Sequence, residues 1–374
     1  MNKSLINLRL AYLRKVNHMT QEELADVIGT SFQTISKWET GVTMPDISVL
    51  PILSDFFNVS VDQLLGLKPL ADEEYISDGT DTRGFWDNHL EYLIRTRNGT
   101  WNADYMRFLV RDVWKINRPV RVLDCGCGFG YIAALLMPCL PKGSTYTGID
   151  FSSSMTKEAS VYLKKHGVNG TVINGDFITF DPEDKYDMVI CKSVLRHLGD
   201  SEPFIRKMIE CADKNALIVC ADSNRELECC GLYIDGLNYG YLCDHEGAIK
   251  HWQTEIDNGK RDYAAAMRSA YVMRRLGLSD VDVRMNDRVS FIYPEQADYD
   301  EKISDFLAHK ESWYDDTDKA IERLINHGMS PMEAEKFVYK SSEICEYVRS
   351  RKGEVALTQF KGETITYGWN RSNG

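Results

Sequence analysis

Three glycines alternate with other residues directly after a short apolar run, in the stretch VLDCGCGFG of residues 122–130. The run 120–123 predicts a buried strand, and the segment 131–137 predicts a helix. Glycines between a strand and a helix let a ligand approach the backbone closely at the start of the helix. The alternating spacing differs from the G-x-G-x-x-G pattern of dinucleotide-binding folds, and Asp124 precedes it. The stretch therefore predicts a nucleotide-like ligand without deciding which one.

Strands and helices alternate in the chain that follows. The apolar runs predict strands at 120–124, 145–149, 171–173, 186–191 and 216–221. Such alternation is typical of a parallel sheet with helices on both faces. Two later runs, 281–285 and 289–293, are separated by a three-residue turn, so we expect them to pair as a hairpin. The predicted fold of this region is α/β and Rossmann-like, with a parallel sheet that ends in an antiparallel hairpin.

A glycine loop after the first strand of such a sheet resembles the class I S-adenosylmethionine-dependent methyltransferases. The stretch from Asp124 to Gly130 is similar to the D/E-x-G-x-G-x-G loop of that family. The resemblance implies S-adenosylmethionine as cofactor, with Gly126, Gly128 and Gly130 admitting its methionine portion and Asp124 helping to hold its ammonium. A Rossmann relative that binds NAD explains the three alternating glycines and Asp124 poorly.

Further cofactor contacts follow from the same resemblance. Asp150 lies 24 positions after Gly126, close to the spacing of about 20 at which an acid takes the ribose hydroxyls. Phe151 and Met155 are placed to pack on the adenine, and Asp176 to accept from its amino group. The remaining candidates are Phe177 beside Asp176, Lys192 in the loop under the sulfonium, and Arg97, Trp101 and Tyr105 in a preceding helix that either closes over the cofactor or simply packs.

The sequence excludes some classes of methyl acceptor but does not identify one. Enzymes that methylate exocyclic base amines or glutamine carry a D/N-P-P-Y type motif after the fourth strand, where this chain reads ICKSV at 190–194. No Pro-Cys nucleophile of the cytosine-5 type is present either, because Cys191 follows isoleucine. A small molecule that accepts at oxygen, nitrogen or carbon is therefore expected. His197 is the candidate catalytic base, or else a structural histidine that fixes its loop.

The segment 224–259 is a long insertion after the fifth strand, and its polar and aromatic residues suit a lid over the acceptor. Adjacent cysteines chelate one tetrahedral ion poorly, so we predict no metal site from its four possible ligands, Cys229, Cys230, Cys243 and His245. Residues 297–374 are predicted as a mostly helical extension with a terminal hairpin at 355–360 and 363–367. No catalytic pattern appears in this extension, which either covers the acceptor or forms a dimer face.

The N-terminal segment predicts short helices joined by tight turns. Thr20 and Glu23 form a capping box, Gly29 ends the first helix, Ser31 caps the next and Gly41 ends it. Residues 1–66 resemble the Cro/repressor (XRE-type) helix-turn-helix family, and this all-α domain is followed by a linker at 67–84. The resemblance implies DNA binding, in which Phe32, Gln33, Thr34 and Lys37 face base edges while Gln21 and Ser36 contact phosphates.

The charge of this module is unusual for DNA binding, because five basic residues oppose seven acids. One alternative is a helical interaction module that has kept the fold and lost DNA binding, and another keeps the enzyme and makes this segment a dimerisation module. Reading two half-sites requires two copies, so a homodimer is expected. The whole chain of 374 residues has a net charge of −12, which argues against broad nonspecific binding to nucleic acid or membranes.

Ten cysteines, mostly in apolar segments, are typical of reduced thiols, and no run reads as a signal peptide or membrane span. A cytoplasmic protein is therefore predicted, with the methyltransferase region at 85–296. The main hypothesis is a small-molecule methyltransferase fused to a DNA-binding transcriptional regulator. The rival is a transcriptional regulator whose methyltransferase-like domain only senses S-adenosylmethionine or a metabolite, because fold alone does not fix function.

Overall fold

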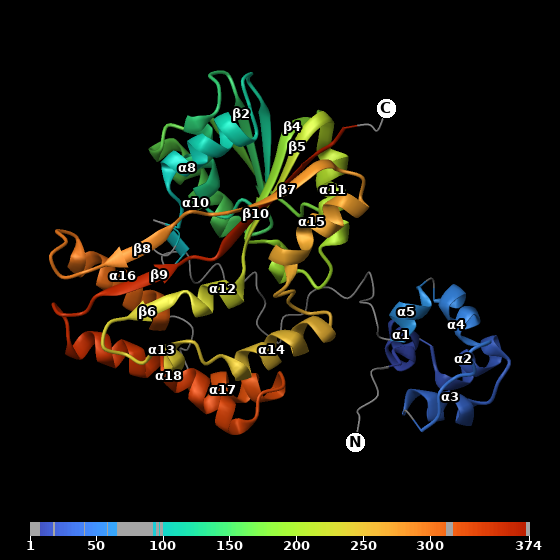
Figure 1. The fold of residues 1–374 in the computed structure, drawn as a ribbon. Helices are drawn as coiled ribbons and strands as arrows, with labels where there is room; N and C mark the ends of the chain where they lie inside the picture. The colour runs from blue at the N-terminus through green and yellow to red at the C-terminus, as the bar shows by residue number, and fades with distance from the viewer. Residues whose placement is uncertain are drawn as a thin grey trace. The chain divides into compact units, whose positions relative to one another are not determined.

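A computed structural model of the chain describes residues 8–17, 19–40, 42–57, 59–65, 93–94, 97, 100–311 and 317–371. The chain forms two compact units, the first within residues 1–76 and the second from most of the remaining chain (Figure 1). The predicted linker at 67–84 lies outside the described residues. Among the described helices, none combines the length and apolar character that crossing a membrane requires.

The first unit is helical, with α1 (Leu10–Val16), α2 (Gln21–Ile28), α3 (Phe32–Glu39), α4 (Leu50–Phe56) and α5 (Val61–Leu64). The predicted capping box of Thr20 and Glu23 is present, and Gly29 ends α2 with a positive φ of 74°. Ser31 caps α3 by accepting from the Thr34 N–H at 3.2 Å. The predicted helix end at Gly41 lies outside the described residues. The helices bury one small core built around Leu24, Ile35, Trp38 and Leu53.

The second unit contains a seven-stranded sheet in the order β3-β2-β1-β4-β5-β10-β7. The strands are β1 (Arg121–Cys125), β2 (Thr145–Asp150), β3 (Gly170–Asn174), β4 (Tyr186–Lys192), β5 (Ala212–Ser223), β7 (Ser279–Met285) and β10 (Glu363–Trp369). The first five pair in parallel, and β10 runs antiparallel to both of its neighbours. The five predicted parallel strands and the antiparallel end of the sheet are therefore confirmed.

Helices cover both faces of this sheet, as the alternation predicts. One face packs against α8 (Ala103–Phe108), the π-helical turn η1 (Leu109–Val113) and α9 (Tyr131–Leu136), which the short η2 (Met137–Cys139) follows. The other face packs against α11 (Glu202–Cys211) and α15 (Ala265–Arg275). Figure 1 shows α11 and α15 on one side of the sheet and α8 and α10 (Ser153–Lys165) on the other.

The pairing of the last strands differs from both predicted hairpins. β7 pairs with β10 rather than with its neighbour β8 (Val289–Ile292), and β8 pairs with β9 (Leu357–Phe360). The segment β7–β8 and the segment β9–β10 thus run antiparallel to each other from the main sheet into a second sheet of order β6-β9-β8. The strand β6 (Leu232–Ile234) completes this second sheet. The links bend instead of reversing: the Asn286 N–H donates to the Glu363 carbonyl at 2.9 Å, and a Cβ at Gly362 would lie 2.8 Å from the Glu228 nitrogen.

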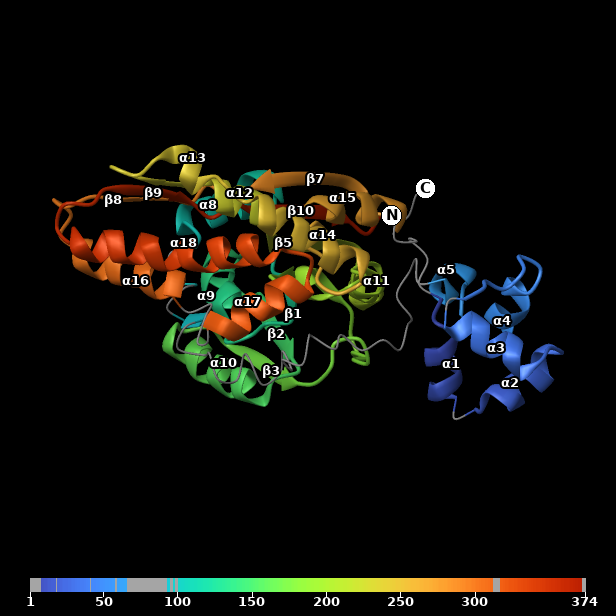
Figure 2. The same ribbon diagram turned by 90° about the horizontal axis from the view of Figure 1, so that it is seen from below.

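The insertion and the C-terminal extension pack on this second sheet. The insertion contains α12 (Arg225–Cys230), β6, α13 (Tyr239–Leu242) and α14 (Glu246–Asp257). The extension contains α16 (Tyr299–Glu311), α17 (Thr317–Asn326) and α18 (Pro331–Ser350), which lie beside the second sheet and α14 (Figures 1 and 2). Apolar side chains of β6, β8, β9, α16 and α18 form one core there. In the sequence, the helical extension therefore lies between β8 and β9, which pair with each other in the second sheet.

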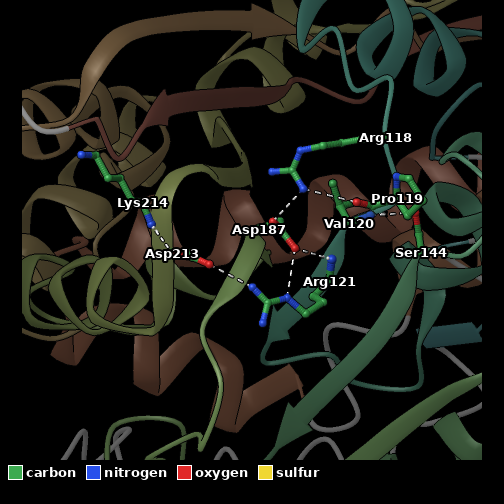
Figure 3. A network of polar contacts seen from close by, with 8 residues as sticks. All are labelled: Arg118, Pro119, Val120, Arg121, Ser144, Asp187, Asp213 and Lys214. Atoms are coloured by element: carbon green, nitrogen blue, oxygen red, sulfur yellow. Dashed lines mark hydrogen bonds and ion pairs between the residues drawn. The ribbon is translucent and has the colours of Figure 1, made fainter.

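Ion pairs join the amino ends of the strands in the main sheet (Figure 3). Asp187 at the start of β4 accepts from the Arg118 side chain at 3.0 Å, and from the Arg121 backbone N–H and Nε at 2.9 and 3.1 Å. Arg121 also reaches Asp213 of β5 at 3.0 Å. Although burial raises the pKa of Asp187, the hydrogen bonds from Arg121 and Arg118 hold it below the usual value. Arg118, Arg121, Asp187 and Asp213 thus each have an opposite charge as partner.

Candidate functional site

The glycine loop lies between β1 and α9, at the carboxyl end of the parallel strands. Gly126, Gly128 and Gly130 all have positive φ, at 77°, 52° and 86°, a conformation that disfavours any side chain. A Cβ at Gly126 would lie 2.6 Å from Val194 Cγ2, so this position also has no room for one. A Cβ at Gly128 would meet no atom within 4 Å, which leaves that side of the loop open. The predicted close backbone approach therefore has a physical basis at Gly128.

Asp124 lies directly below this loop and is fully buried. Its Oδ2 accepts from the Tyr146 hydroxyl at 2.8 Å, whereas its Oδ1 accepts no hydrogen bond from the residues that the structure describes. Burial raises the pKa of Asp124 to about 7, with the charge of Asp150 adding and the Tyr146 hydrogen bond and Lys192 opposing. A buried carboxylate oxygen without a hydrogen-bond donor from the described residues is suited to bind a ligand ammonium. The sequence resemblance implies this role for Asp124.

Asp150 ends β2 and is held by backbone amides. Its Oδ2 accepts from the Gly128 N–H at 2.8 Å and its Oδ1 from the Ser152 N–H at 3.0 Å. A carboxylate oxygen can accept more than one hydrogen bond, as a ribose contact here would require. Phe151 beside it is 46% exposed, while Met155 is buried against Leu93 and Phe129. The ribose role of Asp150 and the adenine roles of Phe151 and Met155 stay predictions.

The two predicted residues after β3 have different surroundings. Asp176 is exposed, and its Oδ1 accepts from the Ile178 N–H at 2.9 Å in a local turn. Phe177 is buried in the core of the sheet, with its ring centroid 4.8 Å from that of Phe204. Asp176 thus keeps an accessible carboxylate for an adenine amino group, whereas Phe177 contributes to the core beneath it. Both assignments as cofactor contacts stay predictions.

Lys192 ends β4 and pairs with Glu363, which begins β10. Its Nζ lies 2.8 Å from Glu363 Oε1, and both side chains are almost completely buried. Trp101 donates to the other carboxylate oxygen of Glu363, and the Lys192 ammonium lies 5.9 Å from the centroid of the Tyr131 ring. The sequence analysis missed Glu363, because the structure places β10 in the main sheet rather than in a terminal hairpin.

Of the three residues predicted in one helix before β1, only Tyr105 lies in α8, and Trp101 precedes that helix. Trp101 and Arg97 belong to the surroundings of Lys192, because Trp101 contacts Glu363 and the charge of Arg97 acts on both members of the pair. Tyr105 instead donates to the Met285 carbonyl at 2.8 Å, at the end of β7. The structure therefore brings Arg97 and Trp101 together with Lys192 and leaves Tyr105 at the edge of the sheet.

His197 lies in the short helix η3 (Leu195–His197), after β4. Its Nε2 lies 3.2 Å from Arg196 Nε. Burial lowers the pKa of His197 well below its usual value, and the charges of Arg196, Arg261, Arg97 and Arg225 lower it further. The imidazole is therefore neutral at pH 7, with its Nε2 in position to accept from Arg196. This contact suits the structural role better than that of a base, and the catalytic role stays a prediction.

Asp222 lies beside His197 in the structure and was not predicted. It is 2% exposed, its Oδ2 accepts from the Leu195 N–H at 3.1 Å, and its Oδ1 receives no hydrogen bond within the described part of the chain. Burial raises the pKa of Asp222 to about 6. A signal for it was present, because an acid at the carboxyl end of a buried parallel strand faces the ligand side of the sheet.

Charged side chains from the insertion and the extension complete this region. Arg225 and Glu228 of α12 form an ion pair, and His309 Nε2 of α16 lies 3.9 Å from Glu228 Oε1. The arginine lowers the pKa of Glu228 to about 2 against the opposing effect of burial. Lys310 and Lys361 also act on Glu228 by charge, and burial lowers the pKa of each. We call the following nine residues the acceptor-side cluster: Arg97, Lys192, Arg196, Asp222, Arg225, Glu228, Lys310, Lys361 and Glu363.

The acceptor-side cluster contains six cations and three carboxylates. Ion pairs within it join Lys192 to Glu363 and Arg225 to Glu228. Arg196, Lys310 and Lys361 have no carboxylate at ion-pair distance among the described residues. Burying like charges is costly, because it removes them from water and adds repulsion. The arrangement is suited to bind a ligand that supplies negative charge.

Comparison with known proteins agrees with both halves of the chain. Residues 116–269 match a family model described as a methyltransferase domain, and residues 10–64 match one described as helix-turn-helix. The ubiquinone biosynthesis O-methyltransferase of Rickettsia akari is 26% identical over 58% of this chain and 74% of its own length. That of Rickettsia felis is 22% identical over 57% of this chain and 80% of its own length.

One of the solved structures that match is a SAM-dependent methyltransferase from Thiobacillus denitrificans in complex with S-adenosyl-L-homocysteine. It is 16% identical, with a TM-score of 0.38 over 72% of this chain and 91% of that one. The family models match separate parts of the chain, one of them within each compact unit. The chain thus joins an XRE-type helix-turn-helix domain to a methyltransferase domain, and S-adenosylmethionine is the cofactor of the second.

Proposed function

We propose that the second unit transfers a methyl group from S-adenosylmethionine to a small molecule that carries negative charge. The observation that carries the proposal is the excess of cations in the acceptor-side cluster, three of which have no ion-pair partner among the described residues. An acceptor with a carboxylate or phosphate group offsets that charge and is oriented by it. The O-methyltransferase name of the matched relatives favours an oxygen atom as the acceptor.

The cofactor supplies an activated methyl group, so the chain mainly has to hold and orient its two ligands. Asp124 would hold the ammonium, and the glycine loop would admit the methionine portion next to it. Removal of a proton from an acceptor hydroxyl requires a base with a pKa near neutrality. Asp222, whose pKa is raised to about 6 and whose Oδ1 accepts no hydrogen bond from described residues, meets this requirement better than His197 does.

A transfer assay with labelled S-adenosylmethionine tests the acceptor class. The probes are hydroxybenzoates and hydroxyalkyl phosphates, each paired with its neutral ester or alcohol. We expect turnover only with the charged member, and a loss of about tenfold or more in kcat/KM for Lys361→Met. Lys214→Met is the matched control, because that lysine is exposed at the opposite end of the sheet. Equal turnover of charged and neutral probes contradicts the anionic acceptor. Binding of S-adenosylhomocysteine without turnover of any probe favours the sensor hypothesis.

We also propose that the first unit binds DNA as part of a transcriptional regulator. Helix α3 buries Ile35 and Trp38 and exposes Phe32, Gln33 and Lys37, so its outer face is available to a major groove. Thr34 is partly covered, with its hydroxyl 2.9 Å from that of Ser31. The roles of these residues and of Ser36 at DNA are predictions that the fold supports without testing them.

Gln21 has a structural contact that bears on its proposed role. Its amide donates to Glu39 Oε2 at 2.7 Å, and Arg14 binds the same carboxylate through two nitrogens at 2.6 and 2.9 Å. Arg14 also donates to the Met19 carbonyl at 2.7 Å, so the three side chains fix α1, α2 and α3 together. A phosphate contact by Gln21 would therefore come from an amide whose position is already held by Glu39.

A gel shift with the DNA upstream of the protein's own gene, at stated salt, tests the regulator. Gln33→Ala should weaken specific binding by about 1–3 kcal/mol, because a bidentate adenine contact is lost. The control is Thr43→Ala, an exposed position outside α3. If the Gln33→Ala and Thr43→Ala variants both bind this DNA as tightly as the unchanged protein does, α3 is not the recognition helix. If the unchanged protein binds no DNA, the alternative of a dimerisation module gains.

A further inference from the structure

Three metal-ligating side chains converge between the insertion and the C-terminal extension. His251 and Glu255 lie on α14, four residues apart and therefore on one face of the helix. His327 lies in the turn between α17 and α18. One ligand atom from each residue lies within 4.8 Å of the other two. The three are separate in the sequence, because 71 residues lie between Glu255 and His327. The only ligands of the insertion that the sequence suggested were Cys229, Cys230, Cys243 and His245.

The surroundings of this group are apolar. Glu255 and His327 are 5% and 6% exposed. The seam around them is formed by side chains of α14, α17 and α18, which include Ala248, Leu324, Met329, Ala334, Val338 and Trp252. A carboxylate and an imidazole are expensive to bury in such a seam, and the partly buried His251 lies next to them. A bound cation would be a shared partner for all three.

The distance between Glu255 and His327 fits two ligands of one ion. His327 Nδ1 lies 3.0 Å from Glu255 Oε1, yet Glu255 Oε1 accepts no hydrogen bond from the described residues. Two ligand atoms, each about 2.1 Å from one metal ion, lie about 3.0–3.4 Å apart. The rings of His251 and His327 are parallel within 3°, with centroids 5.4 Å apart. The contact is short without the geometry of a hydrogen bond, as expected where two lone pairs point at a common centre.

We propose that His251, Glu255 and His327 bind one divalent transition-metal ion, with Zn²⁺ the ion best matched to these ligands. Two histidines and one carboxylate make a three-ligand set that leaves a further position for water. The ion joins α14 of the insertion to the turn between α17 and α18, and so fixes two segments that are far apart in the chain. The site does not depend on the methyltransferase activity, and its residues lie outside the acceptor-side cluster.

The test uses the full chain without an affinity tag, purified without chelators. We expect metal analysis to find close to one zinc ion per chain, and Co²⁺ added after chelation to give the visible absorption of a low-coordinate site. Calorimetry with Zn²⁺ should show one site, weakened by more than about a hundredfold in Glu255→Gln and in His327→Ala. His166→Ala, which removes an exposed histidine at the end of α10, is the control and should bind Zn²⁺ as the unchanged chain does.

Thermal unfolding separates the proposal from a simple ion pair of Glu255 with His327. If an ion is bound, Zn²⁺ raises the midpoint of the unchanged chain by several degrees and a chelator reverses the rise, whereas Glu255→Gln responds to neither. An ion pair alone predicts that Glu255→Gln is less stable and that Zn²⁺ shifts the midpoint of no variant. That second result, or Zn²⁺ binding that Glu255→Gln and His327→Ala leave unchanged, overturns the proposal.

Discussion

The two ends of the main sheet treat charge in opposite ways. At the amino ends of the strands, Asp187 and Asp213 accept from Arg118 and Arg121 on a partly exposed surface, and each of these four charges has an opposite partner (Figure 3). At the carboxyl ends, Asp124 and Asp222 are buried with one carboxylate oxygen each that receives no hydrogen bond from described residues. The first arrangement stabilises the free protein. The second leaves interactions to be completed by ligands, at a cost to the free protein.

The largest effect on stability is expected at the carboxyl end, from breaking the Lys192–Glu363 pair. Glu363→Gln keeps the side-chain shape and an acceptor for Trp101, but it leaves the Lys192 ammonium buried without its carboxylate. Removing one partner of a buried pair costs about 3–5 kcal/mol. Urea unfolding of the second unit should show that loss. A change below about 1 kcal/mol would show that the Lys192 ammonium reaches water or another acceptor when Glu363 is replaced, and that it does not depend on this carboxylate.

Asp124→Asn should separate binding from stability. The carboxylate loses its charge-assisted bond to the cofactor ammonium, so calorimetry should show about 10- to 100-fold weaker binding of S-adenosylhomocysteine. The free protein should be as stable or more stable at pH 8, because burial of the charge disfavours the carboxylate. A variant that binds as tightly as the unchanged protein would remove Asp124 from the cofactor site.

The raised pKa of Asp124 gives the same assay a pH dependence. A carboxyl whose pKa in the free protein is about 7 is protonated below that pH, whereas holding an ammonium requires the ionised form. Affinity for S-adenosylhomocysteine should therefore fall as the pH drops from 8 to 6, by up to about tenfold per unit below 7, with a proton released on binding. Asp124→Asn should abolish this dependence. A flat profile in the unchanged protein would place the titrating group elsewhere.

The smallest effect is expected at the amino end. Asp187→Asn removes the charge that Arg118 and Arg121 share, on side chains that are 63% and 41% exposed. Because solvent screens such pairs, the free energy of unfolding should fall by only about 1–2 kcal/mol. Affinity for S-adenosylhomocysteine should stay the same. A weakening of cofactor binding in this variant would mean that the ion pairs at the amino ends of the strands affect the cofactor site at the carboxyl ends.

The parallel half of the fold was predictable because its signals are local. Apolar runs locate β1 to β5, and the alternating glycines with Asp124 and Asp150 mark the turns at their carboxyl ends. The capping box at Thr20 and the glycine at 29 likewise act within one helix. Each of these features depends on residues close together in the sequence, so periodicity and turn chemistry identify it.

The pairing of the last four strands was not predictable from such signals. Two strands separated by two or three residues indicate a hairpin, and only long-range packing shows that the links at Asn286 and Gly362 bend the chain onward instead. Glu363, Lys310 and Lys361 were missed for the same reason. They come from β10, α16 and the link before β10, which meet only after the pairing is known.

The position of β10 in the centre of the sheet also affects the order in which the protein can be made. β10 fills the gap between β5 and β7, but it is translated after the whole helical extension. Until the ribosome has released it, β5 and β7 have no neighbour on their facing edges, and exposed edges invite pairing with other chains. A nascent chain stalled within the extension would therefore be prone to aggregation, and the acceptor side of the site, which includes Glu363 of β10, would be assembled last.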